Sequence, residues 1–393
     1  MITDIIGHQS ALVILKRAVL SGRIPNAYLF VGQTSVGKTF TALQLAKVLN
    51  CERNADAQSP DTLDCCDECD NCRAINQHNH PDFMLVRPRI SVKSDEGIVD
   101  DGGEEDDSDE GPQVIEIAGS LVTTGQIEAL ISHASLKRVR GRRKVYLITA
   151  AETMNAEAEN RLLKTLEEPP SDTLLILTSS NLGALLPPTI SRCQTINFEA
   201  VPPAEAEAAL RQRFPDYPPD QLHSLVALSG GRVGWAITML QHPEVLQIRS
   251  SLLDLCASLP QRGMVECLRQ GEALLAAAEL WWLASMDRDL AEKALKARRD
   301  RVLRTRMHDI LDVLISWFRD LMVVHADPDS GQVINRDRVD DLRRIAPGCQ
   351  VEKCRRACLY LEDMKRQLRQ NVNLRLAAEI VALRLITASA KAA

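Results

Sequence analysis

Gly32-Gln33-Thr34-Ser35-Val36-Gly37-Lys38-Thr39 is a complete phosphate-binding loop of the form G-x-x-x-x-G-K-T. It follows the apolar run 27–31 and precedes a helical pattern over 40–49, which is the strand–loop–helix context that the motif needs. The glycines let successive backbone N–H groups turn toward a phosphate. Lys38 supplies a cation for the β- and γ-phosphates, and Thr39 can hold Mg²⁺. The stretch predicts a nucleotide-binding α/β domain, with ATP or ADP as the candidate ligand.

Strand-like and helical patterns alternate around this loop as far as about residue 198. The strand-like runs are short and rich in leucine and β-branched residues, as in strands buried on both faces, and they lie at 28–31, 83–86, 114–117, 145–148 and 174–177. Helical patterns at 124–134 and 155–166 separate some of them. This alternation predicts a doubly wound parallel sheet, in which we expect the strand 144–148 to lie beside the phosphate-loop strand.

The rest of the chain is predicted to be helical. At 393 residues the chain is long enough for two or three domains. Pro202-Pro203 opens a small helical segment, and a longer one follows whose last helix is expected to run from 351 to 386. We therefore expect domains at 1–200, 201–245 and 246–393. The acidic stretch at about 91–112 is expected to be a disordered insertion, because it offers few apolar groups to bury.

Composition limits the compartment and the partners. The net charge of −6 gives no overall basic field for nucleic acid. No apolar stretch reaches the length of a membrane span, and the N-terminus lacks a signal-peptide pattern, so we expect a cytoplasmic protein. Eleven cysteines in that compartment indicate metal ligands or free thiols rather than disulfides.

Four of these cysteines have the spacing of a metal site. Cys66-x-x-Cys69-x-x-Cys72, with Cys51 upstream, offers four thiolates, and Zn²⁺ prefers soft ligands in a tetrahedron. The sequence thus favours a structural zinc module at 51–72. Cys65 is an alternative to Cys66, and an iron–sulfur cluster, a redox pair or unligated thiols are the alternatives to zinc.

The second half of an ATPase site is missing from the sequence. Where an ATPase of this arrangement has Asp-Glu for the metal and the attacking water, the strand 144–148 is followed by Thr149-Ala150. Glu152 arrives too late in the chain and is expected to be a solvated residue at a helix start. Phosphoryl transfer depends on placement and charge compensation, so the chain is expected to hold nucleotide without hydrolysing it well.

Two basic features remain. Arg192, in Ser191-Arg192-Cys193, is either a surface arginine at a strand edge or the residue that completes the ATP site of a neighbouring ring subunit. The basic run 137–144 is either a solvated loop or, in a ring around DNA, a phosphate contact.

Together these residues resemble the bacterial clamp-loader AAA+ family of DNA polymerase III. The resemblance is dense over 1–200 and thin over 245–370, and its matching stretches are 6–9, 27–32, 37–39, the four cysteines, 80–83, 141–148, 162–170, 191–193 and 370–376. It implies a P-loop AAA+ domain with a parallel sheet, followed by a small helical lid and an all-α collar that joins the subunits.

Departures from the family pattern select one kind of member. The motor subunits, of the gamma/tau type, carry Asp-Glu at the positions of Thr149 and Ala150 and a sensor arginine in the small helical domain. The sensor position corresponds to Gly234, or to Val233 under a one-residue shift, and Arg232 could substitute only in a different register. The resemblance then implies a stator whose Arg192 acts in trans. Its partners would be gamma/tau and delta subunits, with the sliding clamp and primed DNA reached through the complex. The alternatives are an active gamma/tau-type ATPase and a nucleotide switch or zinc adaptor outside any loader.

Overall fold

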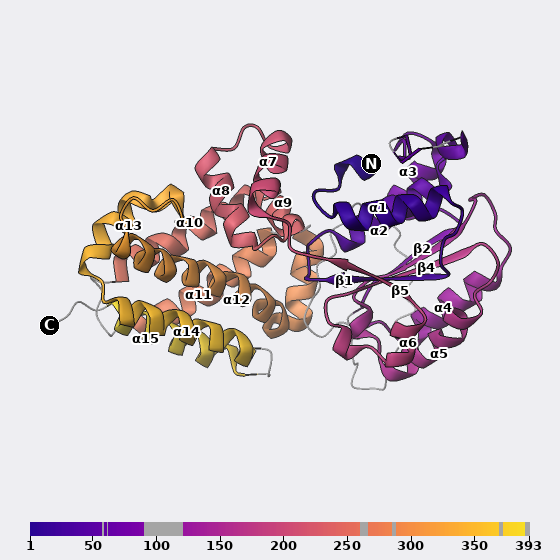
Figure 1. Cartoon of the computed structure of the whole chain (residues 1–393). Helices are drawn as coiled ribbons and strands as arrows, with labels where there is room; N and C mark the ends of the chain where they lie inside the picture. The colour runs from indigo at the N-terminus through magenta and orange to yellow at the C-terminus, as the bar shows by residue number, and fades with distance from the viewer. Residues whose placement is uncertain are drawn as a thin grey trace, which may run out of the picture. The chain divides into compact units, whose positions relative to one another are not determined.

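The computed structural model describes residues 1–56, 59–60, 62–89, 121–259, 266–284, 288–368 and 372–389. The chain divides into two compact units, Met1–Ala206 with Gly231–Gly234 and Glu207–Gly230 with Trp235–Ala393. The first is an α/β unit and the second is built of helices (Figure 1). The expected strand at 114–117 and the acidic stretch at 91–112 lie outside the described residues.

The described part of the first unit contains one five-stranded sheet in the order β2-β3-β4-β1-β5, with every neighbouring pair parallel. The strands are β1 (Ala27–Gly32), β2 (Phe83–Val86), β3 (Lys144–Ile148), β4 (Thr173–Ser179) and β5 (Gln194–Phe198). One face is covered by α1 (Gln9–Leu20), α2 (Lys38–Asn50) and α3 (Asp70–Asn76), and the other by α4 (Thr124–Ser135), α5 (Ala156–Glu167) and α6 (Pro187–Ser191) (Figure 1). The predicted doubly wound α/β fold is confirmed.

Successive side chains of each central strand enter the two cores in turn. Tyr28 and Phe30 pack with the α1 and α2 side, whereas Ala27 and Leu29 pack with the α4 and α5 side. Because both faces of the sheet are buried, the strands appear in the sequence as continuous apolar runs rather than as an apolar–polar alternation.

The expectation that β3 lies beside the phosphate-loop strand is wrong. β4 lies between them, pairing with β1 through Leu29 and Leu177 and with β3 through Leu147 and Ile176. The apolar runs of β3 and β4 are alike, so periodicity does not tell which one neighbours β1. Strand β5 was not expected as a strand, because it is an edge strand whose buried Ile196 and Phe198 alternate with exposed polar residues.

After Val201 the regular structure of the described residues is helical, as expected. The helices are α7 (Pro203–Arg213), α8 (Pro219–Ser229), α9 (Val233–Gln241), α10 (Pro243–Ser258), α11 (Glu266–Ala284), α12 (Arg288–Ala326), α13 (Val339–Ile345), α14 (Val351–Leu368) and α15 (Leu374–Ser389). Trp281, Trp282 and Trp317 are buried in the packing of α11 and α12. In the described part of the chain, no helix combines the length and the apolar character needed to cross a bilayer.

The expected single helix over 351–386 is wrong. It is two helices, α14 and α15, and the described residues Val372 and Asn373 between them are not helical. Asn373 precedes α15, and its Oδ1 accepts the N–H of Leu376 at 3.0 Å. Asparagine is a favoured N-cap because its side chain satisfies an N–H at the start of the helix, so this residue begins a new helix rather than continuing the old one.

A buried ion pair fixes α8 to helices further along the second unit. The guanidinium of Arg249 in α10 donates to both oxygens of Asp337, at 2.7 and 3.0 Å, and to Oδ1 of Asn335 at 2.6 Å. Ser224 in α8 donates to the same Asp337 carboxylate at 2.9 Å. Burial alone would raise the pKa of Asp337, but the hydrogen bonds and charge of Arg249 and the bond from Ser224 lower it.

Asp337→Ala should therefore destabilise the second unit by about 3–5 kcal/mol at neutral pH, because it leaves the Arg249 charge buried and unpaired. The folded pKa of Asp337 is depressed, so its contribution is present above the unfolded pKa of about 3.9 and is lost as pH falls through the folded pKa. All four tryptophans of the chain lie in this unit, so urea unfolding followed by tryptophan fluorescence measures it.

Asp254→Ala is the matched control, because Asp254 also pairs with an arginine, Arg338, at 2.8 Å but is 61% exposed. It should cost no more than about 1 kcal/mol. Equal losses in the two variants would mean that the Arg249–Asp337 pair is no more important than a surface pair.

Candidate functional site

The phosphate loop connects β1 to α2, and the unit's own donors bond its carbonyl oxygens. Lys38 Nζ donates to the carbonyls of Gly32 (2.6 Å) and Gln33 (2.7 Å). His8 Nε2 bonds the carbonyl of Val36 at 2.8 Å, and Gly234 N–H bonds that of Ser35 at 2.8 Å. Four carbonyls of the loop are therefore engaged by side chains or backbone of the same unit.

The N–H groups of Ser35 and Gly37 are available to a ligand. Ser35 and Gly37 have positive φ angles of 63° and 115°, and in the described part of the chain no protein acceptor receives their N–H groups. Gln33, Thr34 and Ser35 are exposed, and the loop ends at the N-terminus of the 13-residue helix α2. Free N–H groups and a positive helix end suit a phosphate, so the residues present fit a nucleotide.

The three residues directly after β3, on the far side of β4 from the phosphate loop, carry no carboxylate. Thr149, Ala150 and Ala151 are all buried, and Thr149 Oγ1 donates to the carbonyl of Val86 at 3.3 Å. Ala150 has a φ of 47°, and its N–H donates to Thr178 Oγ1 of β4 at 3.2 Å. A non-glycine residue at positive φ is strained, so the neighbouring β4 contact helps to hold this turn.

Glu152, the next acidic residue after β3, is bonded to the end of β4. Its Oε1 accepts hydrogen bonds from the N–H and Oγ of Ser180, the first residue after β4. It is half-buried and lies in a short 3₁₀ turn, Ala151–Thr153, rather than being a solvated residue at a helix start. The carboxylate thus joins the end of β3 to the end of β4.

The expected sensor position is closed by backbone contact. A Cβ atom built on Gly234 would lie 2.8 Å from the Ser35 carbonyl oxygen, which no real side chain tolerates. The same carbonyl accepts the Gly234 N–H. Any side chain at 234, an arginine included, would push the segment away from the phosphate loop. At the position where the motor subunits are expected to carry a cation, this chain instead has a backbone hydrogen bond to the phosphate loop.

Arg192 lies at the surface of the first unit, at the end of α6. Its Nε donates to Glu167 Oε1 at 2.7 Å, Nη2 also bonds Glu167, and Nη1 donates to the Pro188 carbonyl at 2.9 Å. One third of the Arg192 side chain is exposed. Glu167 is the last residue of α5, so two helix ends hold the guanidinium.

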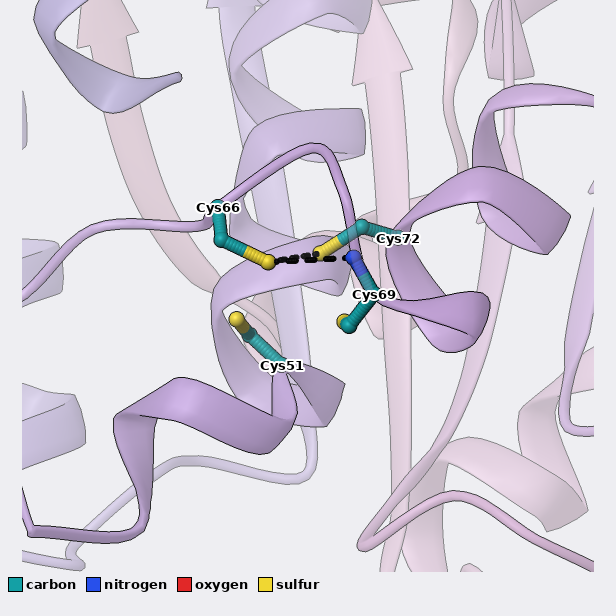
Figure 2. Close-up of side chains that lie close together, drawn as sticks. All are labelled: Cys51, Cys66, Cys69 and Cys72. Carbon is teal, nitrogen blue, oxygen red and sulfur yellow. Dashed lines mark hydrogen bonds between the residues drawn. The ribbon is translucent and has the colours of Figure 1, made fainter.

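The four cysteines predicted to bind metal come together (Figure 2). Cys51 follows α2, Cys66 and Cys69 belong to the next loop, and Cys72 lies in the first turn of α3. Their sulfur atoms all lie within 4.8 Å of one another, with Cys66 and Cys72 4.0 Å apart, and Cys69 N–H donates to Cys66 Sγ at 3.2 Å. This four-cysteine module could hold a metal ion.

Burial raises the pKa of Cys51 and of Cys72. For Cys66 the effect of burial is outweighed by the N–H groups of Cys69 and Glu68, and the pKa is lowered to about 7. Thiolates are the metal-binding form, and a bound cation supplies the charge that makes the buried thiols ionise. The donor set therefore fits a soft divalent metal.

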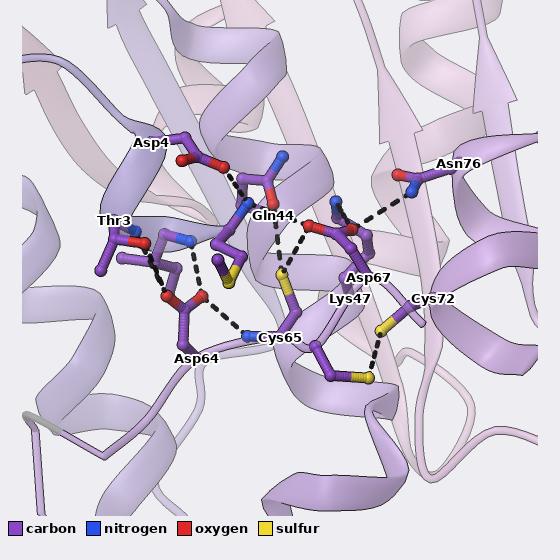
Figure 3. Close-up of polar contacts among 12 residues, drawn as sticks. Thr3, Asp4, Gln44, Lys47, Asp64, Cys65, Asp67, Cys72 and Asn76 are labelled. Carbon is purple, nitrogen blue, oxygen red and sulfur yellow. Dashed lines mark hydrogen bonds and ion pairs between the residues drawn. The ribbon is translucent and has the colours of Figure 1, made fainter. Parts of the chain in front are cut away.

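Cys65 lies outside the module. Its Sγ donates to Gln44 Oε1 at 3.3 Å and lies near Asp67 (Figure 3), and burial raises its pKa to about 12. Adjacent residues of an extended segment point to opposite sides, so only one of Cys65 and Cys66 can face the other three sulfurs. Here it is Cys66.

The basic run 137–144 contacts acidic groups of its own unit. Arg138 pairs with Asp172 at 3.4 Å and Arg140 with Asp70 at 2.8 Å. Lys144 is buried and donates to the last carbonyls of α4, including His133 at 3.0 Å. These charges therefore have structural partners within the unit.

The phosphate loop after β1, in a parallel sheet of this strand order, defines a P-loop nucleotide-binding domain of the AAA+ class. A family model described as "DNA polymerase III, delta subunit" matches residues 7–202. DNA polymerase III subunit delta' of Bacillus subtilis is 26% identical over 362 residues, covering 92% of this chain and 91% of that protein. The same subunit of Pseudomonas aeruginosa is 35% identical over 267 residues, covering 67% and 68%.

The chain therefore belongs to the family of delta-prime subunits of the bacterial DNA polymerase III clamp loader, an assembly of DNA replication. Among solved structures, a gamma subunit-related protein of Thermotoga maritima aligns over 96% of this chain and 99% of that chain, at 15% identity and a TM-score of 0.38.

Cys66→Ser should weaken metal binding by more than the roughly 10- to 100-fold that follows loss of a ligand's hydrogen-bond partner. Cys65→Ser is the matched control and should bind like the unchanged protein, because Cys65 bonds Gln44 instead. Titration with Co²⁺, whose thiolate complexes absorb visibly, measures both. The assignment of ligands is wrong if Cys65→Ser loses the absorption and Cys66→Ser keeps it.

Proposed function

We propose that this chain is a stator of the clamp loader, which lends Arg192 to the ATP site of an adjacent motor subunit and does not hydrolyse nucleotide itself. The observation that carries the proposal is the contrast between the two ends of α5. No carboxylate is present at 149–151 before the helix, while a surface arginine is held in place at its far end.

Nucleotide binding without hydrolysis is consistent with the loop. Four of its carbonyls are bonded within the unit, and the N–H groups of Ser35 and Gly37 are available to donate to a phosphate. Hydrolysis would also need a carboxylate for the metal and a group that orients water, and Thr149 and Ala150 provide neither. An active gamma/tau-type ATPase is the alternative, and it would have to find these groups elsewhere.

The role of Arg192 follows from its chemistry and position. A planar guanidinium matches the charge that develops on a γ-phosphate during transfer. The bonds to Glu167 and Pro188 hold Arg192 at the surface of the unit, where one third of its side chain is exposed. Its partners in this proposal are a motor subunit of the gamma/tau type, the delta subunit and, through the complex, the sliding clamp and primed DNA.

For the four-cysteine module we propose Zn²⁺ in a structural role. Four thiolates suit the tetrahedral preference of zinc and leave no open position for catalysis. An iron–sulfur cluster would use the same ligands but would colour the protein, whereas zinc would not.

Purified alone, the chain should bind ATP without releasing phosphate above the rate in buffer. Lys38→Ala should weaken ATP binding about 10- to 100-fold, because it removes a charged donor to the phosphates. Fluorescent-nucleotide titration and a phosphate-release assay measure the two properties. Lys137→Ala, a change of an exposed lysine, should alter neither. ATP turnover by the chain alone that Lys38→Ala abolishes would establish an active ATPase and contradict the stator proposal.

Arg192→Ala in a reconstituted loader should slow hydrolysis at the one site that receives it by on the order of 10³-fold. The pre-steady-state burst of phosphate should lose one site per complex while gel filtration shows an intact assembly. Arg192→Lys should recover little, because an ammonium lacks the planar fork.

Arg211→Ala is the control, since Arg211 is also exposed and paired with a carboxylate, that of Glu207. An unchanged burst in Arg192→Ala, or a complex that no longer assembles, would mean that Arg192 has a structural role.

A further inference from the structure

The basic run forms a surface loop whose backbone is fixed from inside the unit. We call residues 136–143 the arginine loop. Asp82, which is fully buried, accepts the N–H groups of Val139 (2.9 Å), Arg140 (2.7 Å) and Gly141 (2.6 Å). Burial alone would raise the pKa of Asp82, but these N–H groups lower it, so the carboxylate stays ionised as the central acceptor.

A second anchor comes from the residue before the first metal-site cysteine. Asn50 is buried, and its Oδ1 accepts the N–H of Arg143 at 3.0 Å. The loop approaches it so closely that a Cβ on Gly141 would lie 2.7 Å from the same Oδ1. The loop's last turn therefore has its position set by the side chain next to Cys51.

A third anchor runs from the cysteine module to Asp82. Asn71, the residue before Cys72, donates to the Asn50 carbonyl at 2.9 Å and bonds His80 Nε2 through Oδ1 at 3.3 Å. His80 Nδ1 in turn accepts the N–H of Asp82 at 3.0 Å. All four side chains are buried, so these bonds compete little with water.

Contacts at the surface also join the arginine loop to the four-cysteine module. Arg140 bonds Asp70, which follows Cys69, and Arg142 Nη2 donates to the carbonyl of Glu52, which follows Cys51, at 3.5 Å. Every one of these module partners lies directly beside a cysteine of the module in the sequence. The loop thus contacts the module through residues whose positions depend on where the cysteines are held.

We propose that the four-cysteine module is the structural support of the arginine loop, so that metal binding at the four cysteines fixes the conformation of the loop. A metal held by all four sulfurs cross-links Cys51 to the segment 66–72. The metal thereby holds Asn50 and Asn71 in the relative positions that the hydrogen bonds to the arginine loop require. Without the metal, Cys51 and the segment 66–72 are no longer cross-linked, and the positions of Asn50 and Asn71 relative to each other become less well fixed.

The arginine loop presents a surface that is partly apolar and partly basic. Leu136 and Val139 are 62% and 75% exposed, and they lie among arginines on a backbone that buried bonds hold in place. Loops held rigidly by a scaffold are common binding elements. The metal would therefore control the shape of this surface without contacting it. The inference rests on the proposed metal but not on the role of Arg192.

Hydrogen–deuterium exchange of the intact chain tests the proposal, with metal content measured on the same samples. Chelation should speed exchange of the amides of Val139, Arg140, Gly141 and Arg143 on the order of tenfold, while β1 and α5 stay unchanged. Adding Zn²⁺ back should restore the slow rates. Asp82→Asn should speed exchange of the amides of Val139, Arg140 and Gly141 with metal still bound, because Asp82 accepts these three N–H groups and does not touch the metal site.

Two further variants sharpen the test. Asp172→Asn removes the exposed carboxylate that pairs with Arg138 and should change neither exchange nor metal content. Arg140→Gln, confined to the surface, should give a smaller acceleration and keeps the test available if Asp82→Asn does not fold. The proposal is overturned if the metal leaves and the loop amides keep their rates. It is also overturned if chelation speeds exchange equally across β1 and α5, or if the purified chain binds no metal.

Discussion

The hydrogen bond from Gly234 N–H to the Ser35 carbonyl is the contact on which the nucleotide site depends. His8 bonds the next carbonyl along the loop, that of Val36. With these carbonyls held by the protein, the N–H groups of the loop take the orientation that a phosphate needs. The same contact leaves no space for a side chain at 234, so the bond that shapes the loop also excludes a sensor residue from that position.

Buried carboxylates are distributed unequally between the two edges of the sheet. At the edge where the parallel strands begin, Asp82 is fully buried and organises the arginine loop through three N–H bonds. At the edge where the strands end, near the phosphate loop, Thr149 and Ala150 occupy the positions after β3. A buried carboxylate is costly unless its charge is compensated. Asp82 has that compensation from its three N–H donors, whereas Thr149 and Ala150 carry no charge that would need it.

The sequence predicted most elements, because strands buried on both faces and amphipathic helices leave strong patterns. It could not predict the order of β3 and β4, whose apolar runs are equivalent, or the edge strand β5, which is half polar. The break before α15 depends on one N-cap, Asn373. The spacing of the cysteines indicated a metal site and favoured Cys66 over Cys65, and the structure adds that Cys65 bonds Gln44 in α2 instead. Likewise, nothing local in the sequence connects Asp82 to the arginine loop, more than fifty residues away.

The position of helix α5 gives a geometric reason for the proposed function, in which this chain presents Arg192 to a neighbouring subunit without hydrolysing nucleotide itself. It begins a few residues after Thr149 and Ala150, and it ends at Glu167, which holds Arg192. Its 12 residues span about 18 Å at 1.5 Å per residue, and its inner side is buried against the sheet. A helix packed in this way does not bend, so its two ends keep a fixed position relative to each other. The orientation of Arg192 therefore depends on the core on the α4 and α5 side of the sheet, whereas Val36 of the phosphate loop packs in the core on the α1 and α2 side. A chain can thus lose its own hydrolytic residues and keep the surface arginine in place, because the two depend on different side chains of one rigid unit.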